Sequence, residues 1–64
     1  MKLLKKSTQF NKMLYTMELS EEEKLLSEGE LVNIFKTVVT DEYLGFGYTV
    51  TKFENQLTLK IYTD

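Results

Sequence analysis

The last third of the chain alternates apolar and polar residues, and this pattern constrains the fold more than any other feature. Apolar side chains recur at every second position on both sides of Glu54-Asn55, which predicts two half-buried strands. A two-residue turn at Glu54-Asn55 sets Val50 opposite Leu59 and Tyr48 opposite Ile61. The apolar side chains of both strands then share one face, so we predict an antiparallel hairpin.

A short helix is predicted upstream of this hairpin. Ser20 and Glu23 form a capping box, in which the serine accepts from the Glu23 amide and the glutamate reaches back to the Ser20 amide. We expect this helix to run through Glu28 and to stop at Gly29, the preferred residue after a helix. Because a helix this short needs tertiary contacts, Leu25-Leu26 should dock it on the sheet.

Two segments fit both a strand and a helix. Residues 30–40 are rich in β-branched side chains and precede the turn-like pair Asp41-Glu42, which favours a strand. Their apolar residues also fit helical spacing. Residues 10–19 alternate as a strand does, yet they also contain a helical stripe. We favour a strand in both segments.

These elements predict an α+β fold in a single small domain spanning residues 1–64. One short helix packs on one face of a small antiparallel sheet, in the order β-α-β-β-β, and residues 1–7 form a loose basic N-terminal segment. If the ambiguous segments are helices instead, three helices precede the C-terminal hairpin, and the fold is winged-helix-like.

The composition restricts the chemistry that the chain can perform. It has no His and no Cys, and all its cations are Lys, so the usual zinc ligands, nucleophile–base pairs and bidentate arginine clamps are missing. We expect no enzyme activity, no metal site and no cofactor. No window approaches the roughly 20 apolar residues of a membrane span. Lysine without arginine suits an AT-rich coding sequence, and we expect a cytoplasmic protein of a bacterial host.

Acidic residues crowd residues 18–30, opposed there only by Lys24. Glutamates in the first turn of a helix are favoured by its dipole, so a solvated helix face accounts for most of the cluster. The alternative is a patch that binds a basic protein surface, such as that of a nucleic-acid-binding protein. Its residues would be Glu21, Glu22, Glu23 and Glu28.

A strand at residues 30–40 would give the sheet a second apolar face, formed by Val32, Ile34 and Val38. One short helix covers only one face, so this second face predicts an apolar interface with a partner protein or with a second copy in a homodimer.

Gly45-Phe46-Gly47-Tyr48 is similar to the centre of the RNP1 motif of RNA recognition motif domains. The resemblance covers four positions and implies that Phe46 and Tyr48 stack on bases, which makes them a candidate aromatic contact. That family needs a further helix between its third and fourth strands, and the tight turn between Val50 and Leu57 leaves no room for one. We therefore expect both aromatics to face the helix as core residues.

Together these features predict a small non-catalytic, protein-binding module with a regulatory or inhibitory role, encoded by a phage or mobile element. One alternative is a nucleic-acid-binding protein, either winged-helix-like or binding single strands through Phe46 and Tyr48 with the lysine-rich N-terminus. Another is a structural subunit of a homo-oligomer.

Overall fold

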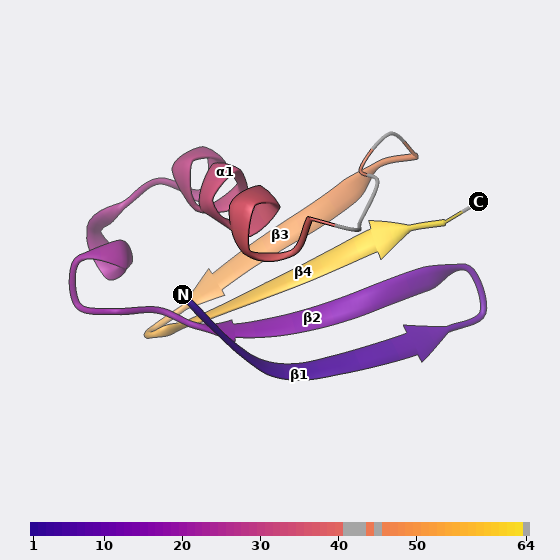
Figure 1. The fold of residues 1–64 in the computed structure, drawn as a ribbon, viewed down its shortest axis with the longest axis horizontal. Coiled ribbons are helices and arrows are strands. Elements are labelled where there is room, and N and C mark those ends of the chain that lie inside the picture. The colour runs from indigo at the N-terminus through magenta and orange to yellow at the C-terminus, as the bar shows by residue number, and fades with distance from the viewer. Residues whose placement is uncertain (41–43, 45, 64) are drawn as a thin grey trace.

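A four-stranded antiparallel sheet with one helix on one face makes up the fold (Figure 1). The computed structural model describes residues 1–40, 44 and 46–63. The strand order across the sheet is β1-β2-β4-β3. In chain order the elements are β1 (Lys2–Gln9), β2 (Lys12–Glu18), the 3₁₀ turn η1 (Glu23–Leu25), α1 (Glu28–Val38), β3 (Tyr48–Phe53) and β4 (Gln56–Tyr62). The expected α+β class is confirmed, and the winged-helix-like alternative is wrong.

The C-terminal hairpin forms in the predicted register. Val50 pairs with Leu59 and Tyr48 with Ile61 across β3 and β4. The backbone N–H of Leu19 donates to the carbonyl of Asn55 at 2.7 Å, so the hairpin turn is also attached to the end of β2. Period-two patterning and turn length together were sufficient to fix this pairing.

The segment predicted as a strand at residues 30–40 is helical as far as Val38, and this expectation is wrong. Ser27 caps the helix, since its Oγ accepts from the Glu30 amide at 3.2 Å. The helical spacing then directs Leu31 and Phe35 at the sheet, where both are fully buried. Burying an apolar stripe outweighs the weak preference of β-branched residues for strands.

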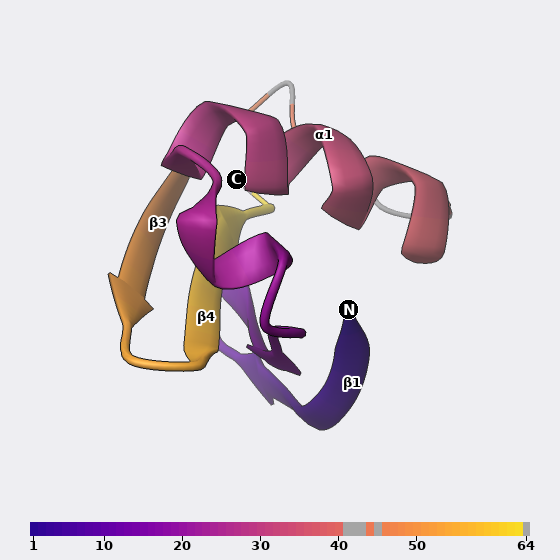
Figure 2. The ribbon, with the colours of Figure 1, turned by 90° about the vertical axis from the view of Figure 1, so that its left-hand side faces the viewer.

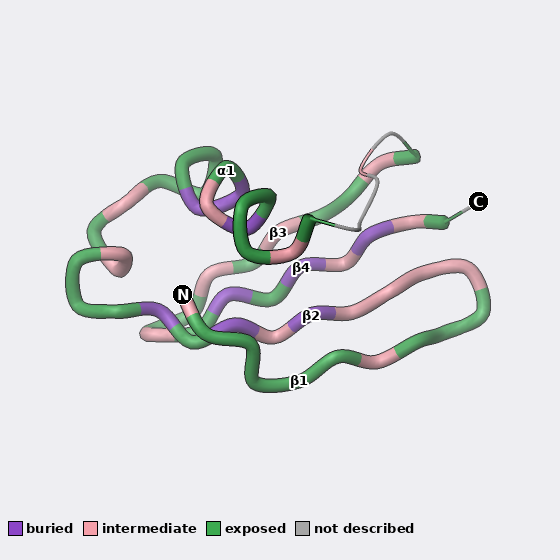
Figure 3. Tube along the Cα trace, viewed as in Figure 1, coloured by how far each residue is buried: buried purple, intermediate pink, exposed green. Residues whose placement is uncertain are grey.

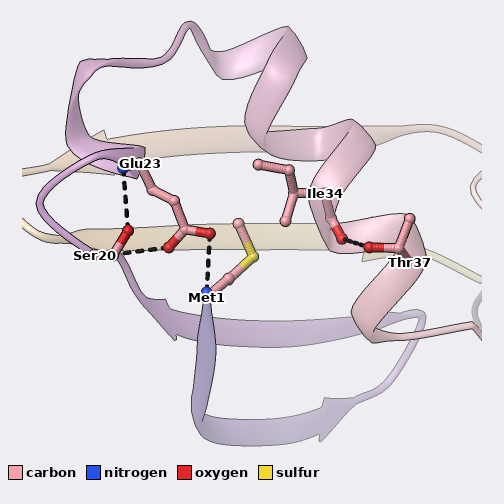
Figure 4. Close-up of polar contacts among 5 residues, drawn as sticks. All are labelled: Met1, Ser20, Glu23, Ile34 and Thr37. Carbon is pink, nitrogen blue, oxygen red and sulfur yellow. Dashed lines mark hydrogen bonds and ion pairs between the residues drawn. The ribbon is translucent and has the colours of Figure 1, made fainter.

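The capping box at Ser20 forms, but it starts only the short turn η1. Glu23 N–H donates to Ser20 Oγ at 3.2 Å, and the Glu23 carboxylate accepts from the Ser20 amide at 2.8 Å (Figure 4). Leu26 is already extended, and Gly29 lies in the first turn of α1 instead of ending a helix. Of the two leucines expected to dock, Leu26 packs against the core and Leu25 is exposed.

Residues 1–7 were expected to be loose, but Lys2–Gln9 form the edge strand β1. This strand pairs antiparallel with β2, with a register shift between Leu3 and Lys5. Lysines and a bulge are both typical protections of an exposed edge against pairing with another chain. The element order is therefore β-β-α-β-β instead of β-α-β-β-β.

The core lies between α1 and the two central strands (Figures 2 and 3). Tyr15 and Phe35 meet at its centre with ring centroids 5.2 Å apart and planes at 73°, an edge-to-face contact. Such a pair stabilises by about 0.5–1.5 kcal/mol beyond its area burial. The buried core residues are Tyr15, Met17, Leu19, Leu31, Val32, Phe35, Leu57, Leu59 and Ile61. The interpretation of residues 10–19 as a strand is thereby confirmed for Lys12–Glu18.

Candidate binding surfaces

Residues 20–28, called the acidic loop below, are fixed to the rest of the molecule at several points. The capping box closes its first turn, and the α-ammonium group of Met1 pairs with Glu23 Oε2 at 2.9 Å (Figure 4). Lys52 reaches across from β3, and its Nζ donates to the carbonyl of Leu26 at 3.1 Å and to that of Lys24. A loop held in this way is ordered before any partner arrives.

Glu23 serves the fold instead of presenting a free charge. The hydrogen bond from the Ser20 backbone amide, followed by the bond to the Met1 ammonium group, lowers the pKa of the Glu23 carboxyl below its usual value of 4.5. The structure therefore assigns to Glu23 a role inside the loop, and it is not available to a partner in the way that the sequence suggested.

The remaining acidic residues are exposed, and they lie within four residues of an exposed leucine in the sequence. Leu25 is 87% exposed in η1, and Glu22 immediately precedes this turn at the surface. Glu21 pairs with Lys24 at 3.0 Å while remaining largely open to solvent. Glu28 lies exposed in the first turn of α1. The exposed part of the predicted patch is thus Glu21, Glu22 and Glu28, with Leu25 beside it.

The predicted apolar interface is not a surface. Val32 is only 3% exposed and belongs to the core, and Ile34 also packs against it. Val38 is 48% exposed, at the last residue of α1. The three residues would share a face only in a strand, and the segment is a helix. The sheet therefore has no second apolar face of this composition, and the reason for expecting a homodimer is removed.

The face of the sheet turned away from α1 is polar, and we call it the polar sheet face. Successive side chains of a strand point to opposite faces, so the residues that alternate with the buried ones lie on this face. Its residues, strand by strand, are Lys2, Lys5, Ser7 and Gln9; Lys12, Leu14, Thr16 and Glu18; Gln56, Thr58, Lys60 and Tyr62; and Thr49, Thr51 and Phe53. A pocket of about 170 Å³ opens on this face, lined by Lys5, Ser7, Gln9, Leu14, Thr16 and Thr58.

Sequence reasoning missed this face because one of its strands, β1, was not predicted and a helical segment was predicted as a strand. With β1 taken as a loose segment and residues 30–40 as a strand, the uncovered side appeared apolar. The threonines of β3 and β4 were visible as the polar positions of the hairpin, and they were the available signal.

The aromatic pair similar to RNP1 does not lie on the polar sheet face. Phe46 precedes β3 and is 60% exposed, whereas Tyr48 pairs with Ile61 and therefore points to the helix side at the sheet edge. Gly45 lies outside the described residues. Tyr48 is itself 42% exposed, so the expectation that both aromatics are core residues is wrong.

Two kinds of feature are absent from the residues that the structure describes. Within that part of the chain, no three or more His, Cys, Asp or Glu side chains gather in a way that could hold a metal ion. Its helices also include none with the length and apolar character needed to cross a bilayer.

The chain matches no protein-family model, no curated protein and no solved structure with which it was compared. Its function is accordingly argued from the two surfaces themselves, the acidic loop and the polar sheet face.

Proposed function

We propose that this protein is a small non-catalytic module that binds a basic surface of a partner protein through its acidic loop. In this proposal the module is regulatory or inhibitory and acts in the cytoplasm of a bacterial host, as a product of a phage or mobile element. The observation that supports it is an ordered loop with an exposed leucine, Leu25, and exposed carboxylates close to it in the sequence.

The fixation of the loop favours binding. A mobile loop loses conformational freedom when a partner orders it, at about 0.5–1.5 kcal/mol for each immobilised long side chain. Here Lys52 and the pair of Met1 with Glu23 already hold the backbone around η1. The loop loses its conformational entropy when the protein folds and not when a partner binds. The contacts of Leu25 with a partner would therefore contribute more fully to affinity.

The chemistry of the loop specifies the kind of partner. Leu25 is an apolar anchor for a small pocket, and apolar anchors at the centre of an interface carry much of the binding energy. Glu21, Glu22 and Glu28 supply negative charge around it. Such a rim accelerates association with a basic surface and makes the rate depend on salt.

Affinity capture followed by calorimetry tests this proposal. The intact chain is immobilised, a bound protein is identified and purified, and its Kd is measured for the wild type and for Leu25→Ser and Glu22→Lys. We expect each substitution to raise Kd at least about tenfold, because each removes an interaction of roughly 1.4 kcal/mol or more. We also expect Kd to rise with added salt.

Phe10→Ser is the matched control, because Phe10 is an equally exposed apolar residue in the turn between β1 and β2. It should leave Kd unchanged. A partner whose binding ignores both loop substitutions and salt would refute the acidic loop as the binding surface. Circular dichroism of each variant confirms that the fold is intact.

A further inference from the structure

We propose that the polar sheet face binds single-stranded nucleic acid, which is a second activity beyond the proposed protein binding. The inference rests on the composition of four rows of side chains that run across the strands on this face. Most rows contain one residue from each strand. These rows follow from the pairing of the strands.

The middle of the face is built from hydroxyl groups and lysines. Thr16 and Thr58 pair across β2 and β4, with Lys5 beyond them on β1 and Thr51 on β3. The next row contains Ser7, Leu14, Lys60 and Thr49. Hydroxyl and ammonium groups are donors that proteins commonly direct at phosphate oxygens. The pocket lined by Lys5, Ser7 and Thr58 adds a recess among these donors.

The charge of this face is opposite to that of the whole chain. Among the residues that the structure describes, it carries four lysines, Lys2, Lys5, Lys12 and Lys60, and one carboxylate, Glu18. Glu18 stands directly opposite Lys2, so Lys5, Lys12 and Lys60 remain without an opposing charge across the strands. The face therefore complements a polyanion, although the formal net charge of the chain is −2.

The acidic residues of the loop act on this face only weakly. The loop lies on the side of the sheet that α1 covers (Figure 2), opposite to the polar sheet face. The Debye length is about 10 Å at 0.1 M salt. Exposed charges that are farther apart than this length are largely screened from each other.

Aromatic rings stand at both ends of the polar sheet face. Phe53 is 72% exposed in the row of Gln56, and Tyr62 pairs with Lys12 in the row at the other end. Tyr62 is half-buried. Aromatic rings beside a basic surface are the platform on which single-stranded nucleic acids stack their bases. This arrangement distinguishes a nucleic acid from a simple inorganic anion.

A nucleic acid fits this surface better than an acidic peptide does. An extended peptide adds to the edge of a sheet, where free backbone groups are available, or enters a groove as a helix. The polar sheet face offers side-chain donors only, since the backbone groups of β2 and β4 are used in the sheet. A flexible chain that carries a charge on every unit can be held by such donors alone.

Fluorescence anisotropy with the full chain tests the inference. The ligand is a labelled oligodeoxythymidine or oligouridine of about twelve nucleotides, a length suited to a small single-strand site. With three unopposed lysines, the slope of log K against log salt should be about −2, from about 0.7 per phosphate contact. Lys5→Ala/Lys60→Ala should weaken binding about tenfold at low salt and reduce the slope to about −0.7. Tyr62→Leu should weaken it at least about fivefold.

Lys6→Ala/Lys36→Ala is the matched control, because it removes the same charge from the other side of the sheet. Lys6 neighbours Lys5 in β1, but its Nζ lies 5.5 Å from the Tyr15 ring on the helix side, and Lys36 is on α1. This control should retain wild-type affinity in the same salt series.

Three outcomes would overturn the inference. The first is no anisotropy change at about 100 μM protein and low salt, the weak limit of non-specific binding. The second is equal weakening by the two double variants. The third concerns competition: polyglutamate would displace the labelled oligonucleotide as effectively as an unlabelled oligonucleotide of equal charge does. That result would assign the face to an acidic protein. None of these outcomes bears on the acidic loop.

Discussion

Glu54 occupies a backbone conformation that suits glycine better than glutamate. Its φ of 54° lies in the left-handed region, which costs an L-residue about 1–2 kcal/mol. Glycine avoids that cost but loses about 0.5–1 kcal/mol more conformational entropy on folding. We therefore expect Glu54→Gly to raise the free energy of unfolding by about 0.5–1 kcal/mol and Tm by roughly 4 °C, measured by thermal unfolding.

Glu22→Gly is the control for this prediction, because Glu22 has an ordinary φ of −70°. There glycine brings the entropic cost without relieving strain, so stability should fall slightly. Equal shifts in the two variants would show that backbone strain at Glu54 is not the cause.

The ionised Glu23 carboxylate stabilises the folded chain in a pH-dependent manner. Its pKa is lowered on folding, so its contribution is present above the unfolded pKa and is lost as pH falls through the lower folded value. Glu23→Gln should lower the free energy of unfolding by about 1 kcal/mol at neutral pH, and the difference should vanish in acid. Urea unfolding from neutral to acidic pH measures this difference.

Glu21→Gln is the control, and it should change the free energy of unfolding by less than about 0.5 kcal/mol, because the pair of Glu21 with Lys24 is exposed. A difference for Glu23→Gln that stays constant with pH would refute the charge-based account.

One pair of substitutions can distinguish helix α1 from the strand that its β-branched residues favour. Val32 is buried and Val38 is exposed. They are six residues apart, so in a strand both would lie on the same face. Val32→Ala should lower the free energy of unfolding by about 2 kcal/mol. Val38→Ala should leave it unchanged or raise it by up to about 0.6 kcal/mol, since Ala favours helices. Urea unfolding measures both, and a similar loss in the two variants would contradict the helix.

The elements differ in how far the sequence could predict them. The β3–β4 hairpin was predictable in register, because alternation and a two-residue turn at Glu54-Asn55 constrain each other. The helix was not, because Ser20 and Ser27 are each followed three residues later by a glutamate, and each serine Oγ accepts from the backbone amide of that glutamate. Only packing decides between them: a helix from Ser27 aligns Leu31 and Phe35 over the sheet, whereas one from Ser20 has no such stripe.

At the scale of the whole molecule, the position of α1 decides which surface is free. The acidic cluster could be predicted from sequence, but its division into structural Glu23 and exposed Glu22 depends on where Met1 lies. The polar sheet face combines four strands from both ends of the chain, and it exists only once β1 has paired with β2. Sequence patterning showed which residues alternate, but it could not show which side of the sheet the helix covers.

Stability should be distributed across the molecule according to strand order. Each amide of β4 faces a neighbouring strand, whereas alternate amides of the edge strand β3 face outward. Tyr62 N–H donates to the Gly47 carbonyl at 3.0 Å, so every second residue from Gly47 onward is in a hydrogen-bonded pair with β4. The amides of Thr49 and Thr51 should therefore bond to β4. Those of Val50 and Lys52 should point away from it. Native-state hydrogen exchange by NMR should therefore find slow exchange at Thr49 and Thr51 and fast exchange at Val50 and Lys52.

The central strands provide the reference for this measurement. Leu59 and Lys60 are neighbours in β4, which is flanked by β2 and β3, and both amides should exchange slowly. Uniform protection along β3 would mean that its outer edge is paired, as in a dimer joined edge to edge. Uniformly fast exchange in β4 would contradict the strand order itself, because an interior strand opens only when the sheet does.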